Sequence, residues 1–231
     1  MSAIQALIFD LDGLLIDTEA PEYQAWREVY ASFGQSLELE VWAAGIGADY
    51  KAFDAVAHLE KLLGRQLDRA AVKARRKKRF LELLDGGRPR PGVEDYLRDA
   101  RRLGLRTAVA SSAPRRWINE RLAPAGLAEN FDAICCLDDV PRAKPEPDLY
   151  LAALAEISVT AGEAVAFEDS PNGISAARRA GLFCVAVPNA VTSRLCLDAA
   201  DLRLESLADV PLEKLLKLIS KEKTDARSGH R

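Results

Sequence analysis

Two carboxylates separated by one position follow a short apolar run near the start of the chain. The run covers residues 6–9, and the acids are Asp10 and Asp12, which precede Gly13. A run this short and this apolar predicts a strand buried on both faces, with Asp10 at its carboxyl end. Ligands of open α/β sheets bind just beyond such strand ends, so the pair is a candidate site. A turn capped by aspartate explains an isolated pair of this kind equally well.

Side chains suited to metal and phosphate binding follow the next apolar runs as well. The runs at 106–110, 131–136 and 164–167 predict further strands. After them come Ser111, Ser112, Asp138, Asp139, Lys144, Glu168 and Asp169. Carboxylates suit a hard divalent cation such as Mg²⁺, while serine, lysine and a helix N-terminus suit a phosphate group. Each residue alone has a plainer explanation as a cap, a surface side chain or a loop start. The agreement of four strand ends predicts a site for phosphate chemistry.

These strand ends need a sheet to bring them together, and the order of the elements predicts one. From about residue 90 onward, strands and helices alternate, which favours a parallel sheet with helices on both faces. The strand at 6–9 finds no partner in the segment that follows it, since residues 15–89 carry helix signals only. We expect an α/β fold in which a doubly wound, Rossmann-like parallel sheet, built from residues 1–14 and 90–231, is interrupted by an all-helical domain at 15–89. A helical domain placed directly after the acid pair would act as a lid.

Composition and charge place the chain among ordinary globular proteins. Its 231 residues are 48% hydrophobic, and 32 basic against 35 acidic residues give a formal net charge of -3. That balance argues against a nucleic-acid-binding protein, and no apolar run reaches the roughly 20 residues that a membrane-spanning helix needs. The four cysteines lack CxxC spacing, which argues against a zinc site or a disulfide framework. We expect a cytoplasmic monomer with neither nucleic acid nor membrane as a partner.

Four motifs in order along the chain resemble those of the haloacid dehalogenase superfamily. They are Asp10-Leu11-Asp12-Gly13, Ser111 after Ala108-Val109-Ala110, Lys144 within Ala143-Lys144-Pro145-Glu146-Pro147, and Glu168-Asp169-Ser170 followed by Asn172-Gly173. Within the superfamily, the chain is similar to the branch of β-phosphoglucomutase and the sugar-phosphate phosphatases, which carries a helical cap inserted after the first strand. The resemblance covers nearly the whole chain and implies a Mg²⁺-dependent enzyme acting on a small phosphorylated metabolite.

The resemblance also implies how the motif residues divide the reaction. Asp10 would attack phosphorus and form an aspartyl-phosphate. Asp12 would protonate the leaving alcohol and then deprotonate the water that hydrolyses the intermediate. Ser111 and Lys144 would neutralise the phosphoryl oxygens, with Ser112 beside them as a further substrate contact.

A metal site is implied by the same motifs. Mg²⁺ would be held by the Asp10 carboxylate, the main-chain carbonyl of Asp12 and the Asp169 carboxylate. Glu168 would bind the ion directly or support one of these ligands. An oxygen-only set of this kind is what Mg²⁺ prefers in proteins.

The branches of the superfamily differ at positions that this sequence can be checked for. Relatives that cleave carbon–halogen or carbon–phosphorus bonds lack the second aspartate, so Asp12 favours phosphate esters. Glu22 stands where the resemblance places the cap histidine of β-phosphoglucomutase, and the loop at 45–49 lacks the arginine that would hold a second phosphate. We therefore favour a phosphatase. A phosphosugar mutase of the β-phosphoglucomutase type stays open, as does a catalytically silent member that binds a metabolite or a protein.

The helical segment holds the candidate residues for substrate choice. Glu22 and Gly45 occupy cap positions that we expect to contact the substrate. The basic run at 73–79 is either a solvated helix face or the source of one side chain, Arg76 or its neighbour Lys77, that points into the cleft and recognises an anionic substrate. Thr18 is either a helix cap or a substrate contact.

Overall fold

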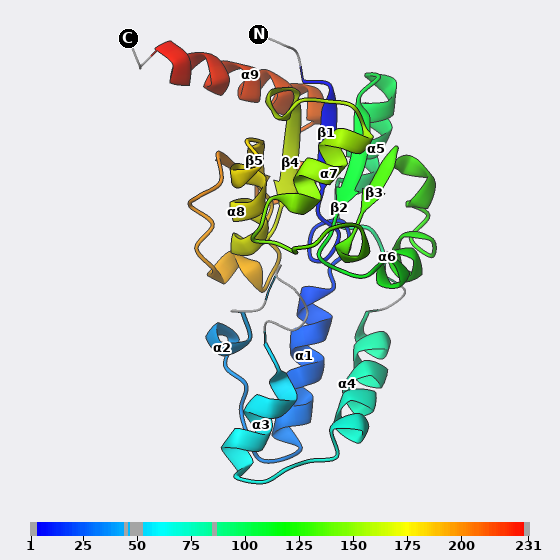
Figure 1. The fold of residues 1–231 in the computed structure, drawn as a ribbon, viewed down its shortest axis with the longest axis vertical. Helices are drawn as coiled ribbons and strands as arrows, with labels where there is room; N and C mark the ends of the chain where they lie inside the picture. Colours follow the sequence, from blue (N-terminus) through cyan, green and yellow to red (C-terminus); the bar gives the residue numbers. More distant parts are fainter. Residues whose placement is uncertain (1–3, 44–45, 47–52, 85–86, 229–231) are drawn as a thin grey trace.

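Six parallel strands form one sheet at the centre of the larger part of the molecule (Figure 1). The computed structural model describes residues 4–43, 46, 53–84 and 87–228. The strands are β1 (Ala6–Phe9), β2 (Arg106–Ala110), β3 (Ala133–Cys135), β4 (Ala164–Glu168), β5 (Phe183–Ala186) and β6 (Leu202–Arg203). Their spatial order is β3-β2-β1-β4-β5-β6, which places β1 at the point where the order of the chain reverses. Ligands bind at this switch point in doubly wound sheets.

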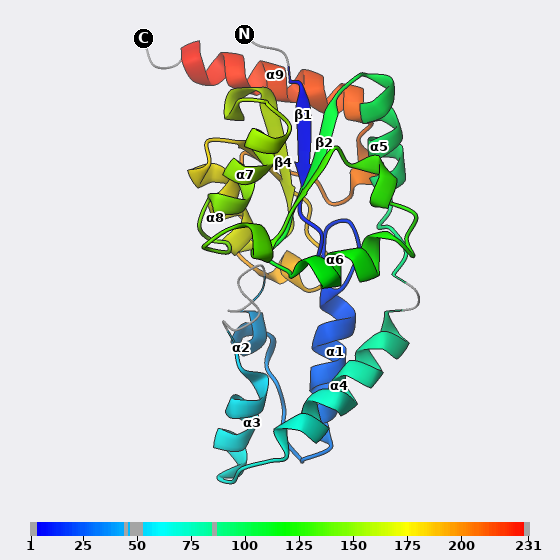
Figure 2. The ribbon, with the colours of Figure 1, turned by 45° about the vertical axis from the view of Figure 1, so that its right-hand side comes forward.

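Helices cover both faces of the sheet (Figures 1 and 2). One face packs on α5 (Val93–Arg102), α6 (Arg115–Leu122) and α9 (Leu212–Ser228), and the other packs on α7 (Asp148–Glu156) and α8 (Pro171–Arg179). Within β1, Leu7 and Phe9 belong to the first of these cores, while Ala6 and Ile8 belong to the second. This alternation explains why the whole strand is apolar, since neither face of it meets water. The expected α/β fold is confirmed.

In the described part of residues 17–89, four helices form a second packed unit beyond the carboxyl edge of the sheet (Figure 2). They are α1 (Glu19–Ala31), α2 (Leu39–Ala43), α3 (Ala55–Leu63) and α4 (Arg69–Leu83), called the helical unit below. Trp26 and Tyr30 of α1 share a buried cluster with Leu59 of α3 and Val72 of α4. The unit therefore has an apolar core of its own, as a separately folding domain requires.

The chain leaves the sheet and returns to it at neighbouring positions. Ile16 forms isolated bridges with Asp12 and with Pro89, so the outgoing and incoming segments lie side by side. Leu15 and Ile16 pack in the core of the sheet, although the sequence places them in the helical domain. The exact boundary of that domain stays a prediction. No helix in the described part of the chain is long and apolar enough to cross a membrane.

Candidate active site

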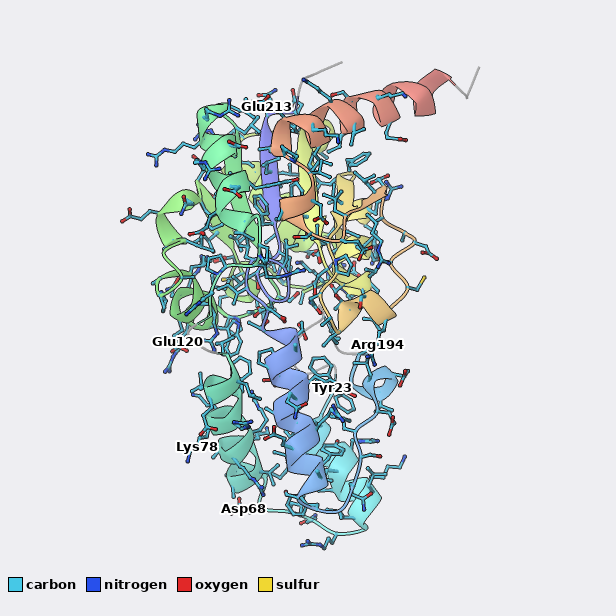
Figure 3. The ribbon with its side chains drawn as sticks, turned by 180° about the vertical axis from the view of Figure 1, so that it is seen from behind. Tyr23, Asp68, Lys78, Glu120, Arg194 and Glu213 are labelled. Carbon is cyan, nitrogen blue, oxygen red and sulfur yellow. The ribbon has the colours of Figure 1, made fainter. Side chains whose placement is uncertain are left out.

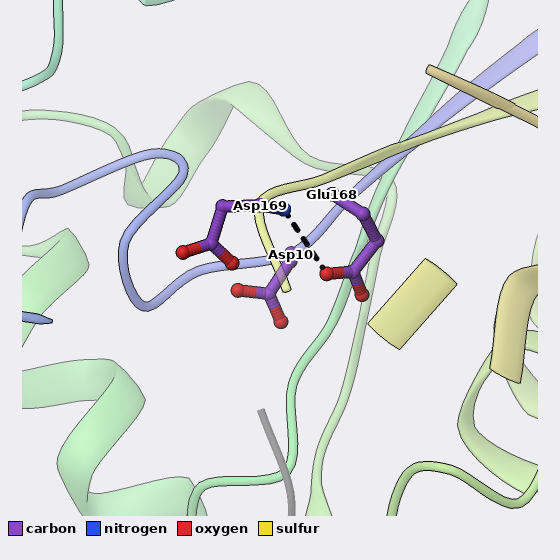
Figure 4. Close-up of side chains that lie close together, drawn as sticks. All are labelled: Asp10, Glu168 and Asp169. Carbon is purple, nitrogen blue, oxygen red and sulfur yellow. Dashed lines mark hydrogen bonds between the residues drawn. The ribbon is translucent and has the colours of Figure 1, made fainter. Parts of the chain in front are cut away.

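Three buried carboxylates meet at the switch point of the sheet (Figure 4). Asp10 follows the last residue of β1, and Glu168 and Asp169 lie at the end of the adjacent strand β4. One oxygen of each carboxylate lies within 4.8 Å of the others. The three residues are called the acidic cluster below. Parallel pairing of β1 with β4 is what brings these side chains together, as the strand-end pattern of the sequence predicts.

Lys144 provides the positive charge inside this cluster. Its Nζ atom donates to Asp10 Oδ1 and to Glu168 Oε1, the latter at 2.7 Å, and its side chain has no exposed surface. Tyr150 donates a further hydrogen bond of 2.6 Å to Glu168 Oε1. Lys144 offsets one of three negative charges, and a buried charge needs a partner or a metal. The remaining charge and the oxygen-only donor set of the acidic cluster therefore fit a divalent cation such as Mg²⁺.

Burial and crowding shift the protonation of the acidic cluster. Burial raises the pKa of Asp10 to about 7, against the opposing attraction of Lys144. Burial and the neighbouring carboxylates of Asp10 and Glu168 raise the pKa of Asp169 well above its usual range. Burial alone would lower the pKa of Lys144, but Asp10 and Glu168 raise it above its ordinary value. The Lys144 ammonium therefore stays charged. A further cation nearby would stabilise the ionised form of the Asp10 and Asp169 carboxylates.

Asp12 lies outside the acidic cluster with its side chain held separately. Thr18 Oγ1 and Trp117 Nε1 both donate to Asp12 Oδ1, each at 2.9 Å. Burial raises the pKa of Asp12, and these two hydrogen bonds lower it in part. The expected metal contact of Asp12 runs through its main-chain carbonyl, so the position of the side chain does not conflict with it. Thr18 occupies the N-cap position of α1 without a side-chain cap hydrogen bond, because its hydroxyl is engaged with Asp12.

The two serines after β2 lie beside these groups. Ser111 is buried, and its Oγ accepts a hydrogen bond of 3.1 Å from the Ala113 amide. Ser112 Oγ accepts a 3.4 Å hydrogen bond from the Lys144 amide, and both serines line the same cavity as Asp10. Asp138 and Asp139, the predicted acids after β3, are not among the residues that line this cavity, and both accept hydrogen bonds from Arg115 instead.

Asn189 binds Asp169 of the acidic cluster, although it was not predicted as a site residue from the sequence. Its Nδ2 atom donates to Asp169 Oδ2 at 2.7 Å and to the Gly13 carbonyl at 3.1 Å. Its Oδ1 accepts from the amides of Val191 and Thr192, which fixes the orientation of the amide group. Asn189 follows β5, so the rule that located the other strand ends could have found it had it been applied to this strand. Arg90 contributes nearby through hydrogen bonds to the carbonyls of Gly13, Val187 and Pro188.

Gly173 in the first turn of α8 makes room for Glu168. A Cβ atom added at this position would overlap the Glu168 carboxylate. Ser170 caps the same helix by accepting from the Gly173 amide at 3.1 Å. Main-chain groups of the first helical turn thus pack against the acid, and only glycine permits that approach.

A cavity of about 760 Å³ lies between the sheet edge and the helical unit. Asp10, Asp12 and Ser111 line its floor on the side of the sheet. Glu22 and Arg76 line it on the side of the helical unit, where they form a 2.8 Å ion pair. The two predicted substrate contacts on α1 and α4 therefore bind each other and face the same space as the acids. Gly45 lies outside the described residues.

The basic run on α4 divides between two faces of the helix. Lys73, Arg76 and Lys77 line the cavity, as side chains at positions i, i+3 and i+4 of one helix face do. Arg79 pairs instead with Glu28 of α1, and Figure 3 shows Lys78 on the side of α4 away from α1. Part of the run is therefore a solvated or packing face, and Arg76 points toward the cavity.

The fold and the site define a doubly wound α/β protein with a buried acidic centre at the carboxyl edge of its parallel sheet. The family model described as haloacid dehalogenase-like hydrolase matches residues 4–181. The chain belongs to this family. The expected family resemblance is thus confirmed, and so is the expectation of an enzyme of its phosphatase type.

Curated relatives match along most of their length. YhcW of Bacillus subtilis is 43% identical over 215 residues, which cover 92% of this chain and 96% of that protein. The phosphorylated carbohydrates phosphatase of Thermotoga maritima is 32% identical, with 78% of this chain and 82% of that protein covered. The relatives include phosphatases of phosphorylated metabolites, which supports the expected class of enzyme.

Solved structures share the fold. CbbY from Rhodobacter sphaeroides in complex with xylulose-(1,5)bisphosphate has a TM-score of 0.71 at 31% identity, over 92% of this chain and 99% of that one. The β-phosphoglucomutase of Clostridium difficile has a TM-score of 0.73 at 22% identity, over 97% and 99% of the two chains. The second similarity shows the fold alone.

Proposed function

We propose that the chain is a Mg²⁺-dependent phosphatase that hydrolyses a small phosphorylated metabolite, with a sugar phosphate as the first candidate. The observation that carries the proposal is the position of Asp10. Its carboxylate lines the cavity and at the same time belongs to the acidic cluster that Lys144 binds. A relative named for phosphorylated carbohydrates and a solved complex with a sugar bisphosphate support the substrate class.

Mg²⁺ would be held by the carboxylates of Asp10 and Asp169 and the main-chain carbonyl of Asp12. Glu168 is occupied by Lys144 and Tyr150, which suits a supporting position next to the ion. When bound, Mg²⁺ would supply positive charge that keeps Asp10 ionised and offsets the charge of the phosphoryl oxygens.

In the first step, an Asp10 carboxylate oxygen attacks phosphorus, and the bond from phosphorus to the substrate oxygen breaks. The Asp12 carboxyl group gives its proton to the departing alcohol. Lys144 already lies against Asp10 and would neutralise charge on the transferred group, together with the hydroxyl of Ser111. The products of this step are the free alcohol and an aspartyl-phosphate.

In the second step, the Asp12 carboxylate takes a proton from water as the water attacks phosphorus. The bond between phosphorus and Asp10 breaks, inorganic phosphate leaves, and both aspartates return to their starting states. The helical unit would act as a cap that admits substrate and then excludes bulk water from the first transfer. Arg76 and Glu22 would face the non-reacting part of the substrate across the cavity.

Release of inorganic phosphate tests the proposal directly. A panel of sugar phosphates and 4-nitrophenyl phosphate is assayed with Mg²⁺ and with EDTA, using the wild type and Asp10→Asn. We expect metal-dependent release that the variant loses, and one phosphoryl group on the Asp10 peptide after a rapid acid quench. Turnover that survives Asp10→Asn would reject the mechanism, and absence of turnover would favour a silent binding protein.

A mutase gives a different product pattern. Conversion of β-glucose 1-phosphate with a bisphosphate primer into glucose 6-phosphate, with little inorganic phosphate, would replace the phosphatase proposal by the mutase alternative. We expect phosphate release instead, because Glu22 puts a carboxylate at the cap position of the mutase histidine.

A further inference from the structure

Trp117 connects the proposed proton-transfer residue with the helical unit. It belongs to α6, and its indole N–H donates to Asp12 Oδ1 at 2.9 Å. Its ring stacks on Phe80 of α4, with ring centroids 5.6 Å apart and an angle of 29° between the planes. Phe80 is fully buried, so this contact belongs to the packed interface between the helical unit and the sheet.

A second packing partner of the indole is Arg121, one turn further along α6. Its guanidinium carbon lies 3.9 Å from the Trp117 ring centroid and 5.6 Å from that of Phe80. Arg121 Nε is buried and has no hydrogen-bond partner among the described residues, and Nη1 donates to the Glu120 carbonyl at 3.3 Å, so the guanidinium is held by this bond and by the two rings. The Trp117 ring is thus fixed by side chains from both parts of the molecule.

The chemistry of the indole group decides which Asp12 oxygen can carry a proton. An indole N–H is a donor only, so the oxygen that it binds must act as an acceptor. Thr18 donates to the same oxygen, and the described residues make no hydrogen bond to Oδ2. The arrangement keeps Oδ1 as the anchored oxygen and leaves Oδ2 to hold the proton at the wall of the cavity.

We propose that Trp117 is a positioning residue, which orients the Asp12 carboxyl group for proton transfer and is itself held in place by Phe80 of the helical unit. This inference rests on the proposed function, in which Asp12 protonates the leaving group. Docking of the helical unit and orientation of the proton donor are then one event. A cap that is not seated on the sheet leaves Trp117 without one of its two packing partners.

The test compares two substrates that differ only in the leaving group. Phenol has a pKa of about 10, like tyrosine, and needs the proton as it leaves. 4-Nitrophenol is much more acidic, so it departs as the phenolate anion and does not need a proton from the enzyme. In Trp117→Phe, which keeps the stacked ring and removes the N–H, kcat/KM for phenyl phosphate should fall roughly 10-fold, and that for 4-nitrophenyl phosphate less than about 3-fold.

Trp26→Phe is the matched control. Trp26 lines the same cavity, but its indole N–H donates to Glu22 Oε1 at 3.1 Å rather than to Asp12. We expect this variant to change kcat/KM for the two substrates by the same factor. The inference would be overturned if Trp26→Phe lowered kcat/KM for phenyl phosphate, relative to 4-nitrophenyl phosphate, as much as Trp117→Phe does.

Asp12→Asn separates failure of the inference from failure of the proposed function. One outcome is that Asp12→Asn lowers kcat/KM for phenyl phosphate more than for 4-nitrophenyl phosphate, while Trp117→Phe lowers both values by the same factor. Trp117 is then only a packing residue. If Asp12→Asn lowers kcat/KM for both substrates by the same factor, the proposed role of Asp12 fails and the inference fails with it.

If Trp117→Phe does not fold, NMR of the indole N–H groups tests the hydrogen bond between Trp117 and Asp12 instead. The chain has three tryptophans, so the wild-type spectrum holds three indole N–H resonances. Asp12→Asn should shift the Trp117 resonance and leave that of Trp42 in place. An unmoved Trp117 resonance would show that the hydrogen bond is absent in solution and would overturn the inference.

Discussion

The Lys144 ammonium lies 2.7 Å from the Glu168 carboxylate, and neither side chain has any exposed surface. Lys144 also pairs with Asp10, so one buried cation holds two members of the acidic cluster. Removing one partner of a buried pair leaves an uncompensated charge, which costs about 3–5 kcal/mol. The charges proposed for the reaction therefore also decide the stability of the sheet edge.

Lys144→Met should lower the free energy of unfolding by about 3 kcal/mol in EDTA and abolish phosphate release. Mg²⁺ should raise the unfolding midpoint more in this variant than in the wild type, because the acidic cluster then lacks its internal cation. Thermal unfolding with Mg²⁺ and with EDTA measures both effects. Lys78→Met, at an exposed position on the same chain, is the control and should leave both midpoints unchanged. An equal Mg²⁺ effect in Lys144→Met and wild type would contradict the prediction.

The metal-free protein should lose stability as pH rises from about 4 to about 7. Burial raises the pKa of Asp10 to about 7, and Asp169 is shifted in the same direction, so the folded protein binds more protons than the unfolded chain in this window. Metal ligands must be deprotonated, so the affinity for Mg²⁺ should rise over the same window. Unfolding midpoints near pH 5 and pH 7.5, in EDTA and in Mg²⁺, test this. Asp10→Asn should weaken the pH dependence in EDTA, and an unchanged dependence would refute the role of Asp10.

Gly173→Ala should displace the Glu168 carboxylate, because the added Cβ has no space beside it. We expect a loss of about 1–3 kcal/mol in stability together with weaker Mg²⁺ binding, measured by unfolding and by calorimetric titration. Gly162→Ala is the matched control, since a Cβ at that position meets no atom within 4 Å. The control should stay within about 0.5 kcal/mol of the wild type. Wild-type Mg²⁺ affinity in Gly173→Ala would show that the position of Glu168 is not critical.

Arg76→Ala should raise KM for a sugar phosphate about 10-fold with a smaller change in kcat, because the loss of a charged contact away from phosphorus affects binding more than chemistry. Arg79→Ala, three residues along α4, removes an ion pair with Glu28 and should leave KM unchanged. Steady-state kinetics of both variants check the prediction. Equal KM values in the two variants would show that Arg76 does not bind substrate and would favour the solvated helix face as the role of residues 73–79.

The strand ends of the site were predictable because they depend on local patterns. An apolar run followed by a polar residue marks the end of a buried strand, and parallel pairing brings all such ends to one edge. Asp10, Ser111, Lys144, Glu168 and Asp169 were found in this way. The two-residue strand β6 and the helix α9 were not predicted, and β6 is too short to carry a periodic signal.

Contacts between helix faces depended on tertiary structure. The four-residue spacing of Trp117 and Arg121 puts them on one face of α6, but nothing in the sequence places Phe80 beside them, because that contact depends on the docking of α4. The direction of Arg76 was open for the same reason, since helical periodicity says which residues share a face but not which face meets the cavity.

The sequence by itself determined the parallel sheet, the helical insertion pattern and the residues at the strand ends, since these follow from hydrophobic periodicity and chain order. Only the tertiary structure decided what holds each of those residues. Asp12 is anchored by Thr18 at the start of α1 and by Trp117, 105 residues away on α6, and Asp169 is anchored by Asn189 from the loop after β5. The physical reason is that strand ends are aligned by backbone hydrogen bonds of fixed geometry, whereas side-chain partners are chosen by how separate elements pack.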